Sequence, residues 1–158
     1  MNQYGTPYTW YALFSYYGIT PMTELMAICL PHNTLPAIWN VRHHQWPDVK
    51  PYWDSMDNWW TSSEFVGYWN ECPPMKVNRK NILASAFVKK NKALLVVANW
   101  NYDRIKNVKV DINKKCIGLS GKVSLTNALT GQKLDTETDG TLMLDINPRD
   151  VCLILVEG

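Results

Sequence analysis

Two short polar stretches in the first half of the chain carry the side chains best suited to chemistry. His32 and Asn33 follow an apolar run, and Arg42 and His43 stand just before Trp46. Imidazole, amide and guanidinium groups can hydrogen-bond a hydroxyl-rich ligand, and an indole face can stack on the C–H bonds of a sugar ring. These five residues are therefore the candidate substrate-binding residues. Loop hydrogen bonds for the polar side chains, and core packing for Trp46, are the alternatives.

The spacing of the cysteine and histidine side chains does not predict a metal site. The adjacent side chains of His43 and His44 point in different directions, so we do not expect them to share a metal. The four cysteines include no CxxC pair and no Cys-His cluster with zinc spacing. We therefore expect no disulfide, no metal and no cofactor, with Cys29 and Cys152 as buried thiols in apolar runs.

Four of the five acidic residues in residues 1–70 have a structural explanation. Glu24 fits the first turn of a helix and Asp48 fits a helix N-cap, where a carboxylate is favourable. Asp54 and Asp57 fall on the polar face of a second helix. No Gly-rich phosphate loop or nucleophile elbow occurs. The sequence therefore provides no convincing pair of catalytic carboxylates.

Aromatic residues and charge divide the chain near the Pro73-Pro74 pair. Residues 1–70 hold seven Trp, seven Tyr and two Phe, with a net charge of −3, whereas residues 71–158 hold three aromatics and a net charge of +5. The basic residues of the second half alternate with acids along expected strands, which indicates a solvated face and not a nucleic-acid site. No apolar run approaches the roughly 20 residues of a membrane helix, and no signal peptide is visible.

The first half is expected to be mainly helical. Residues 8–17 are helix-compatible, and a second helix starts at Thr20-Pro21 and stops at Pro31. Residues 35–41 fit a buried strand or a loop. An apolar stripe at helical spacing predicts one amphipathic helix over residues 47–60, and residues 65–69 are expected to be extended.

The second half changes to the period-two pattern of β-strands. Lys89-Lys90-Asn91-Lys92 predicts a hairpin turn in which Asn91 takes a positive φ. Seven strands at this spacing favour an antiparallel sandwich. They are expected at residues 82–88, 93–99, 108–112, 123–128, 134–138 (a weak edge strand), 142–146 and 151–156.

Three stretches resemble the C-terminal end of large bacterial glycoside hydrolases, in particular α-galactosidase-like barrel proteins. Residues 49–57 (VKPYWDSMD), continuing to 65–70 (FVGYWN), look like the last helix of a (β/α)8 barrel and the exit to a sandwich. Residues 93–100 (ALLVVANW) are similar to a buried sandwich strand that ends in Asn-Trp, and residues 127–132 (NALTGQ) to a following turn.

The resemblance implies an α+β fold, in which a few helices from the end of a (β/α)8 barrel precede an all-β antiparallel sandwich. Residues 1–73 would be the barrel remnant and residues 76–158 the sandwich. A whole barrel takes about 250 residues, so this chain would hold its last one or two βα units, with the catalytic carboxylates upstream. Alone it would be inactive. The full-length parent would bind carbohydrate, not nucleic acid or membrane, and would be secreted or periplasmic if it carries a signal.

Two other hypotheses stay open. The chain could be a free-standing carbohydrate-binding or cell-surface module that uses its exposed aromatic side chains. It could also be a protein that docks on a partner. The most specific version of this hypothesis is that the chain completes a barrel encoded by a separate gene.

Overall fold

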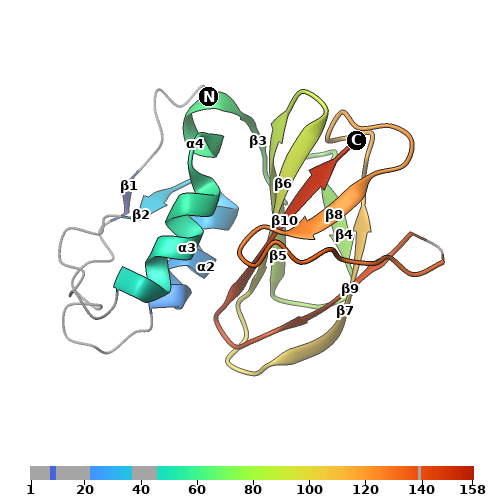
Figure 1. Ribbon diagram of the computed structural model, residues 1–158. Coiled ribbons are helices and arrows are strands. Elements are labelled where there is room, and N and C mark those ends of the chain that lie inside the picture. The colour runs from blue at the N-terminus through green and yellow to red at the C-terminus, as the bar shows by residue number, and fades with distance from the viewer. Residues whose placement is uncertain (1–7, 10–21, 37–45, 139) are drawn as a thin grey trace.

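The computed structural model of the protein describes residues 8–9, 22–36, 46–138 and 140–158 (Figure 1). The first half contains short strands and helices: β1 (Tyr8–Thr9), α2 (Met22–Cys29), the 3-10 helix η1 (Leu30–His32), β2 (Leu35–Pro36), α3 (Trp46–Met56) and α4 (Trp59–Ser62). The strands that follow are β3 (Glu64–Val66), β4 (Met75–Val77), β5 (Ile82–Lys89), β6 (Lys92–Asn99), β7 (Ile105–Ile112), β8 (Ser124–Asn127), β9 (Leu142–Ile146) and β10 (Val151–Glu157). Among the described helices, none is long and apolar enough to cross a membrane.

The strands from β3 onward form two antiparallel sheets. Over the described residues, the larger sheet has the order β3-β5-β6-β10-β8 and the smaller sheet the order β4-β7-β9. The hairpin of β5 and β6 turns at Asn91, whose φ is 62°, as the sequence predicts. The α+β fold with an antiparallel sandwich is therefore confirmed.

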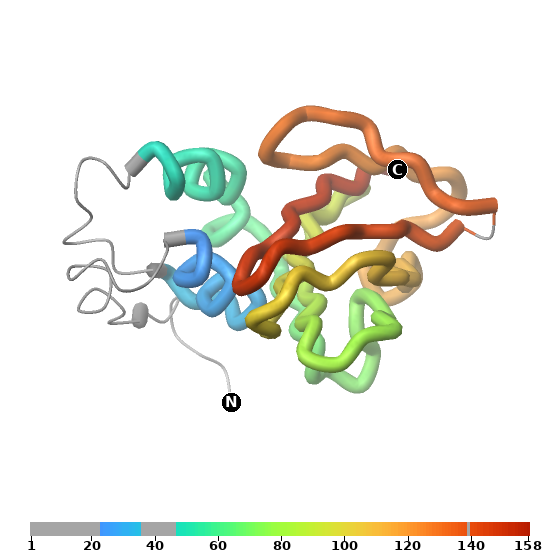
Figure 2. Tube along the Cα trace, turned by 90° about the horizontal axis from the view of Figure 1, so that it is seen from below, coloured from blue at the N-terminus to red at the C-terminus, as the bar shows by residue number. Residues whose placement is uncertain are grey.

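The larger sheet is the middle of three layers, with the helices on one face and the smaller sheet on the other (Figures 1 and 2). Successive side chains of a strand point to opposite faces. On β6, Leu94 and Val96 pack against the helices, whereas Leu95 and Val97 pack against the smaller sheet. The strand is consequently apolar from Ala93 to Ala98, as strands covered on both faces are.

β1 and β2 form a parallel pair that is separate from the sandwich. Tyr8 pairs with Leu35 and Thr9 with Pro36, and α2 lies between the two strands in the sequence. A helix over residues 8–17 is therefore wrong at Tyr8 and Thr9, where pairing with β2 outweighs local preference. The rest of that predicted helix, residues 10–17, lies outside the described residues.

The apolar stripe over residues 47–60 occupies two helices instead of one. The break falls at Asn58, whose φ is 62°, a left-handed conformation that Asn tolerates better than most residues. The apolar residues on both sides of the break are buried, as Met56 and Trp59 show. Asp48 lies in the first turn of α3, which begins at Trp46, and so is not the N-cap.

Two further predictions from the sequence are wrong. Residues 134–138 make one isolated bridge, between Thr136 and Leu142, and no described strand. Cys72 and Cys116 form a disulfide, with their Cα atoms 5.9 Å apart. Their separation of 44 residues gives no local signal, because the fold alone brings the two loops together.

Candidate functional site

The structure describes three of the five predicted site residues, His32, Asn33 and Trp46. His32 is the last residue of η1, and Asn33 follows it with a left-handed φ of 53°. Both precede β2 in the chain. Trp46 begins α3. Arg42 and His43 lie outside the described residues, so their predicted role remains a prediction.

His32 lies among three aromatic side chains, which together with it we call the aromatic cluster: His32, Tyr68, Trp69 and Trp100. The ring centroids of His32 and Trp69 are 6.0 Å apart with an interplanar angle of 16°, and those of His32 and Trp100 are 5.4 Å apart. The Tyr68 ring meets the His32 ring edge-on at 5.7 Å. The cluster joins η1, the turn after β3 and the end of β6.

Hydrogen bonds fix the tautomer of His32. Its Nδ1 lies 2.7 Å from the carbonyl oxygen of Ile28. A carbonyl can only accept, so Nδ1 carries the proton of the neutral ring and Nε2 is an acceptor. The Tyr68 hydroxyl, 3.3 Å from Nε2, therefore donates to it. The lone pairs of the Tyr68 oxygen remain able to accept a hydrogen bond from a ligand.

Ser85 and Gly67 hold the turn that carries Tyr68 and Trp69. The buried Ser85 hydroxyl donates to the carbonyl oxygen of Pro31 at 2.8 Å and accepts from the backbone N–H of Tyr68 at 3.1 Å. A Cβ on Gly67 would lie 2.6 Å from the Trp69 indole, so only glycine permits this position of the ring. The Ser85 hydrogen bonds thereby hold the turn next to η1 in the absence of a ligand.

The Asn99-Trp100 end of β6 anchors the cluster from the other side. Trp100 donates from Nε1 to the carbonyl oxygen of Ala27 in α2, at 3.0 Å. Asn99 is fully buried, donates to the carbonyl oxygens of Asp103 and Asn147 at 2.9 Å each, and accepts from the backbone N–H of Asn101 at 2.9 Å. This dipeptide therefore joins the loops at one end of the sandwich to the helical layer.

The cluster reaches solvent through Tyr68 and Trp69. Trp69 is 56% exposed and Tyr68 is 37% exposed, whereas His32 is half-buried. The sequence pattern predicts only an extended exit segment for these two residues. Their role depends on contacts with His32, 36 residues away from Tyr68, for which no local pattern exists.

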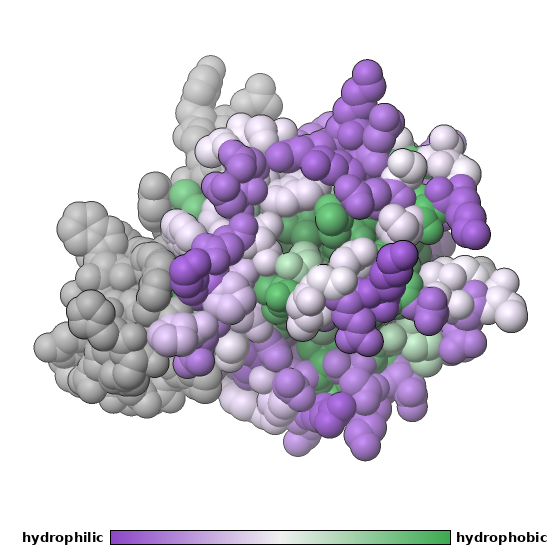
Figure 3. Space-filling model, in the orientation of Figure 1, coloured by the Kyte–Doolittle hydropathy of each residue, from purple (hydrophilic) through white to green (hydrophobic). Residues whose placement is uncertain are grey.

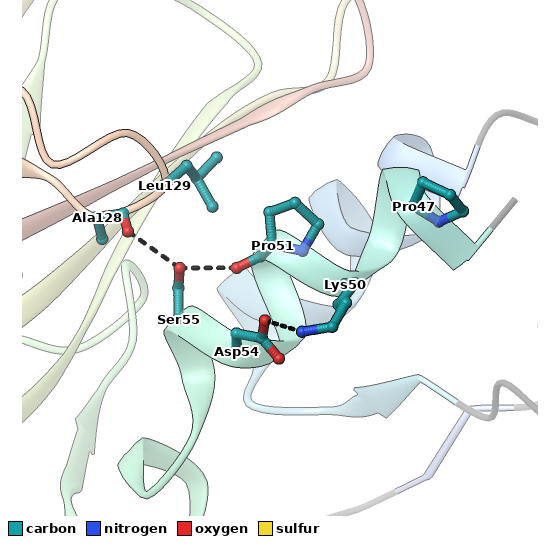
Figure 4. A pocket seen from close by; sticks show the side chains of 7 residues that line it. All are labelled: Pro47, Lys50, Pro51, Asp54, Ser55, Ala128 and Leu129. Carbon is teal, nitrogen blue, oxygen red and sulfur yellow. Dashed lines mark hydrogen bonds and ion pairs between the residues drawn. The ribbon is translucent and has the colours of Figure 1, made fainter.

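A second candidate is a cavity of about 650 Å³ between α3 and the loop after β8 (Figure 4). Its lining residues are Pro47, Lys50, Pro51, Asp54, Ser55, Ala128 and Leu129. Ser55 Oγ lies within hydrogen-bond distance of the carbonyl oxygens of Pro51, at 2.7 Å, and Ala128, at 3.1 Å, while Lys50 pairs with Asp54. Hydrophobic side chains also reach the surface among the strands (Figure 3). The polar groups lining the cavity are paired with one another, so it provides no evident nucleophile or acid–base pair.

Two carboxylates elsewhere in the structure, those of Glu24 and Asp150, have partners that explain them. Glu24 pairs with Nε of Arg149 at 3.5 Å, and the Arg149 guanidinium lies 4.2 Å from the centroid of the Tyr102 ring. Asp150 accepts a hydrogen bond from the Tyr52 hydroxyl at 3.0 Å; burial, aided by this carboxylate, raises the pKa of Tyr52. Within the described residues, no group of three or more His, Cys, Asp or Glu is placed to hold a metal.

A family comparison decides what kind of domain this is. The model of the family described as "Glycoside hydrolase 123, C-terminal domain" matches residues 48–156. The chain belongs to this family. The resemblance to the C-terminal part of a glycoside hydrolase is thus confirmed, and the matched range runs from α3 through the whole sandwich.

A solved glycoside hydrolase structure, that of the Anoxybacillus α-amylase, shares the fold. The Anoxybacillus α-amylase aligns with a TM-score of 0.57 and 10% identity, over 96% of this chain and 36% of that enzyme. The Thermotoga maritima α-fucosidase aligns with a TM-score of 0.43 and 10% identity, over 91% of this chain and 33% of that enzyme. The Bacillus circulans β-galactosidase aligns with a TM-score of 0.36 and 20% identity, over 54% of this chain and 10% of that enzyme.

The chain therefore spans about a third or less of the length of these three enzymes. A search of curated proteins found no match to the sequence.

Proposed function

We propose that this glycoside hydrolase C-terminal domain completes and stabilises a catalytic (β/α)8 barrel. In this proposal, residues 1–73 form the end of the barrel and residues 76–158 form the sandwich that packs on it. The catalytic carboxylates lie upstream, and this chain alone is inactive. Carbohydrate is the ligand of the whole enzyme.

The observation that carries the proposal is the order β1–α2–β2–α3 with a parallel β1–β2 pair. A strand followed by a helix, repeated with parallel strands, is the unit from which such barrels are built. Parallel sheets occur with both faces covered and with more than two strands. The β1–β2 pair is therefore best explained as part of a larger parallel sheet, to which upstream strands would add.

A shared core explains how the sandwich would stabilise the barrel. Leu25 and Met26 of α2 and Val49 of α3 belong to the same buried cluster as Val96 of β6 and Leu153 of β10. Burying apolar area at this boundary favours keeping the helices in place, at about 25 cal/mol per Å². The helices of the last βα units would thus be stabilised by the sandwich.

The positions of the predicted substrate-binding residues fit this proposal unequally. Sites in barrel enzymes form in the loops that follow the carboxyl ends of the strands. Arg42 and His43 follow β2 and precede α3 in the chain, which supports a role near the sugar, next to Trp46. His32 and Asn33 precede β2, at its amino end.

The experiment begins with the DNA upstream of Met1 and continues with the full-length protein it encodes. We expect that protein to release p-nitrophenol from a nitrophenyl glycoside and this chain alone to release none. Leu153→Ala, in the shared core, should lower the melting temperature of the barrel and the sandwich together, whereas Lys109→Ala, on an exposed position of β7, should change neither. A stop codon directly upstream, or a barrel melting temperature unaffected by Leu153→Ala, would contradict the proposal.

A second function is favoured by the aromatic cluster. The exposed Trp69 indole offers a face for a sugar ring, and the Tyr68 oxygen can accept from a sugar hydroxyl because its own proton is directed to His32. We propose this cluster as a carbohydrate contact. Titrating oligosaccharides terminated by galactose, xylose or glucose should shift the indole N–H resonance of Trp69 but not that of Trp53; no shift across the panel would rule the contact out.

A further inference from the structure

The four cysteines differ sharply in their surroundings. Cys72 is exposed and Cys116 half-buried, and the two are joined by the disulfide. Cys29 and Cys152 are free thiols, on α2 and β10. Burial raises the pKa of each free thiol to about 12, so neither forms a reactive thiolate near neutral pH. The fold therefore selects one pair for oxidation.

The backbone brings Cys72 and Cys116 together through contacts that do not involve their sulfur atoms. Asn113 accounts for most of these contacts: its backbone N–H donates to the carbonyl oxygen of Pro74 at 2.9 Å, and its side-chain amide donates to that of Pro73 at 3.3 Å. The carbonyl oxygen of Asn113 accepts from the backbone N–H of Cys116 at 3.0 Å. The resulting Cα separation of 5.9 Å is in the range typical of disulfides.

The bond lies at the open end of the β4–β7 ladder. Met75 of β4 pairs with Ile112 of β7, and the two cysteines lie just beyond this pair, three residues before Met75 and four after Ile112. β4 is a three-residue edge strand of the smaller sheet. Its pairing with β7 covers only three residues, so a covalent link at its end adds a restraint to few backbone hydrogen bonds.

We propose that Cys72 and Cys116 form a redox-dependent clamp on β4, and that the protein matures in an oxidising compartment outside the cytoplasm. Two thiols lose two protons and two electrons as the S–S bond forms. A thiol–disulfide oxidoreductase supplies the oxidant: its own disulfide accepts the electrons and is reduced to two thiols. Disulfides of this kind persist in secreted and periplasmic proteins and are rare in the cytosol.

Peptide mapping of the native protein by mass spectrometry tests the disulfide and the compartment. Cells of the natural host are opened in N-ethylmaleimide, and the protein is then denatured in the same reagent. We expect maleimide on Cys29 and Cys152 without reduction, and on Cys72 and Cys116 as well only if the denatured protein is first reduced. We also expect the protein in the secreted or periplasmic fraction. Maleimide on Cys72 or Cys116 without reduction, another disulfide pairing by peptide mapping, or a cytoplasmic location would overturn the proposal.

Urea denaturation with and without dithiothreitol tests the clamp. The wild-type midpoint should fall in reductant, and the double variant Cys72→Ser/Cys116→Ser should show the lower midpoint in both conditions. Cys152→Ala is the matched control and should keep the response to reductant. A wild-type midpoint that does not move, although mass analysis shows the bond reduced, would refute the clamp.

Discussion

Leu94→Ala and Leu95→Ala test whether both faces of the larger sheet are packed. The two leucines are neighbours on β6, and their exposed fractions are 1% and 0%. Leu94 packs in the core beneath the helices, and Leu95 in the core between the sheets. Each substitution removes three buried carbon atoms, at about 0.8 kcal/mol per buried CH₂. With the cavity left behind, each should lower the free energy of unfolding by roughly 2.5–5 kcal/mol.

The measurement is urea denaturation followed by far-ultraviolet circular dichroism, with tryptophan fluorescence as a second probe. Tryptophan fluorescence reports mainly on the first 69 residues, which hold seven of the eight tryptophans, and circular dichroism reports mainly on the sheets. Because the helices and the sheets share a core, the two parts should unfold together. Both probes should therefore report the same loss of free energy of unfolding for both variants. If Leu94→Ala cost less than about 0.5 kcal/mol while Leu95→Ala had its full effect, the helices would not cover the sheet in solution. The three-layer description would then be wrong.

Three more predictions concern the turn after β3 and the free thiols. Gly67→Ala should push aside the Trp69 ring, because the added methyl group would lie 2.6 Å from it; acrylamide quenching should then increase, and unchanged quenching would contradict the packing. Ser85→Ala should cost about 1–3 kcal/mol in urea denaturation, because two buried hydrogen bonds are lost; a neutral effect would show that water replaces the hydroxyl. Burial raises the pKa of Cys29 and Cys152 from the ordinary 9.0 to about 12 in the folded protein. As the pH rises above 9, these thiols therefore lose their protons in the unfolded chain before they do so in the folded protein. The free energy of unfolding should consequently fall by about 1.4 kcal/mol per thiol for each pH unit above 9. Urea midpoints at pH 8 and pH 10 check this fall, and Cys152→Ala should make it smaller.

Much of the sandwich was predictable because its physics is local. On β7 and β9, one face is covered and the other is solvated, so apolar and polar residues alternate. β6 and β10 are covered on both faces, and their apolar runs indicate buried strands without alternation. The turn at Asn91 follows from the tolerance of Asn for a positive φ.

The features that were missed depend on parts of the chain meeting in space. The apolar stripe of α3 and α4 continues across Asn58, so periodicity alone hides the break. The aromatic cluster brings His32 against Tyr68 and Trp69 through the buried Ser85, which looks like an ordinary strand residue in the sequence. The Cys72–Cys116 pair is set by the meeting of two loops, and spacing could not have revealed it.

The place of β10 in the larger sheet has a consequence for how the protein is made. β10 lies between β6 and β8, in register with β6 from Val151↔Ala98 to Glu157↔Lys92. During synthesis it leaves the ribosome after every other described strand. Until then β6 has an open edge, and the apolar face that α2 and α3 cover is incomplete. Such long-range pairing is slow and leaves aggregation-prone surface exposed, so the nascent chain should depend on chaperones until its last strand is available.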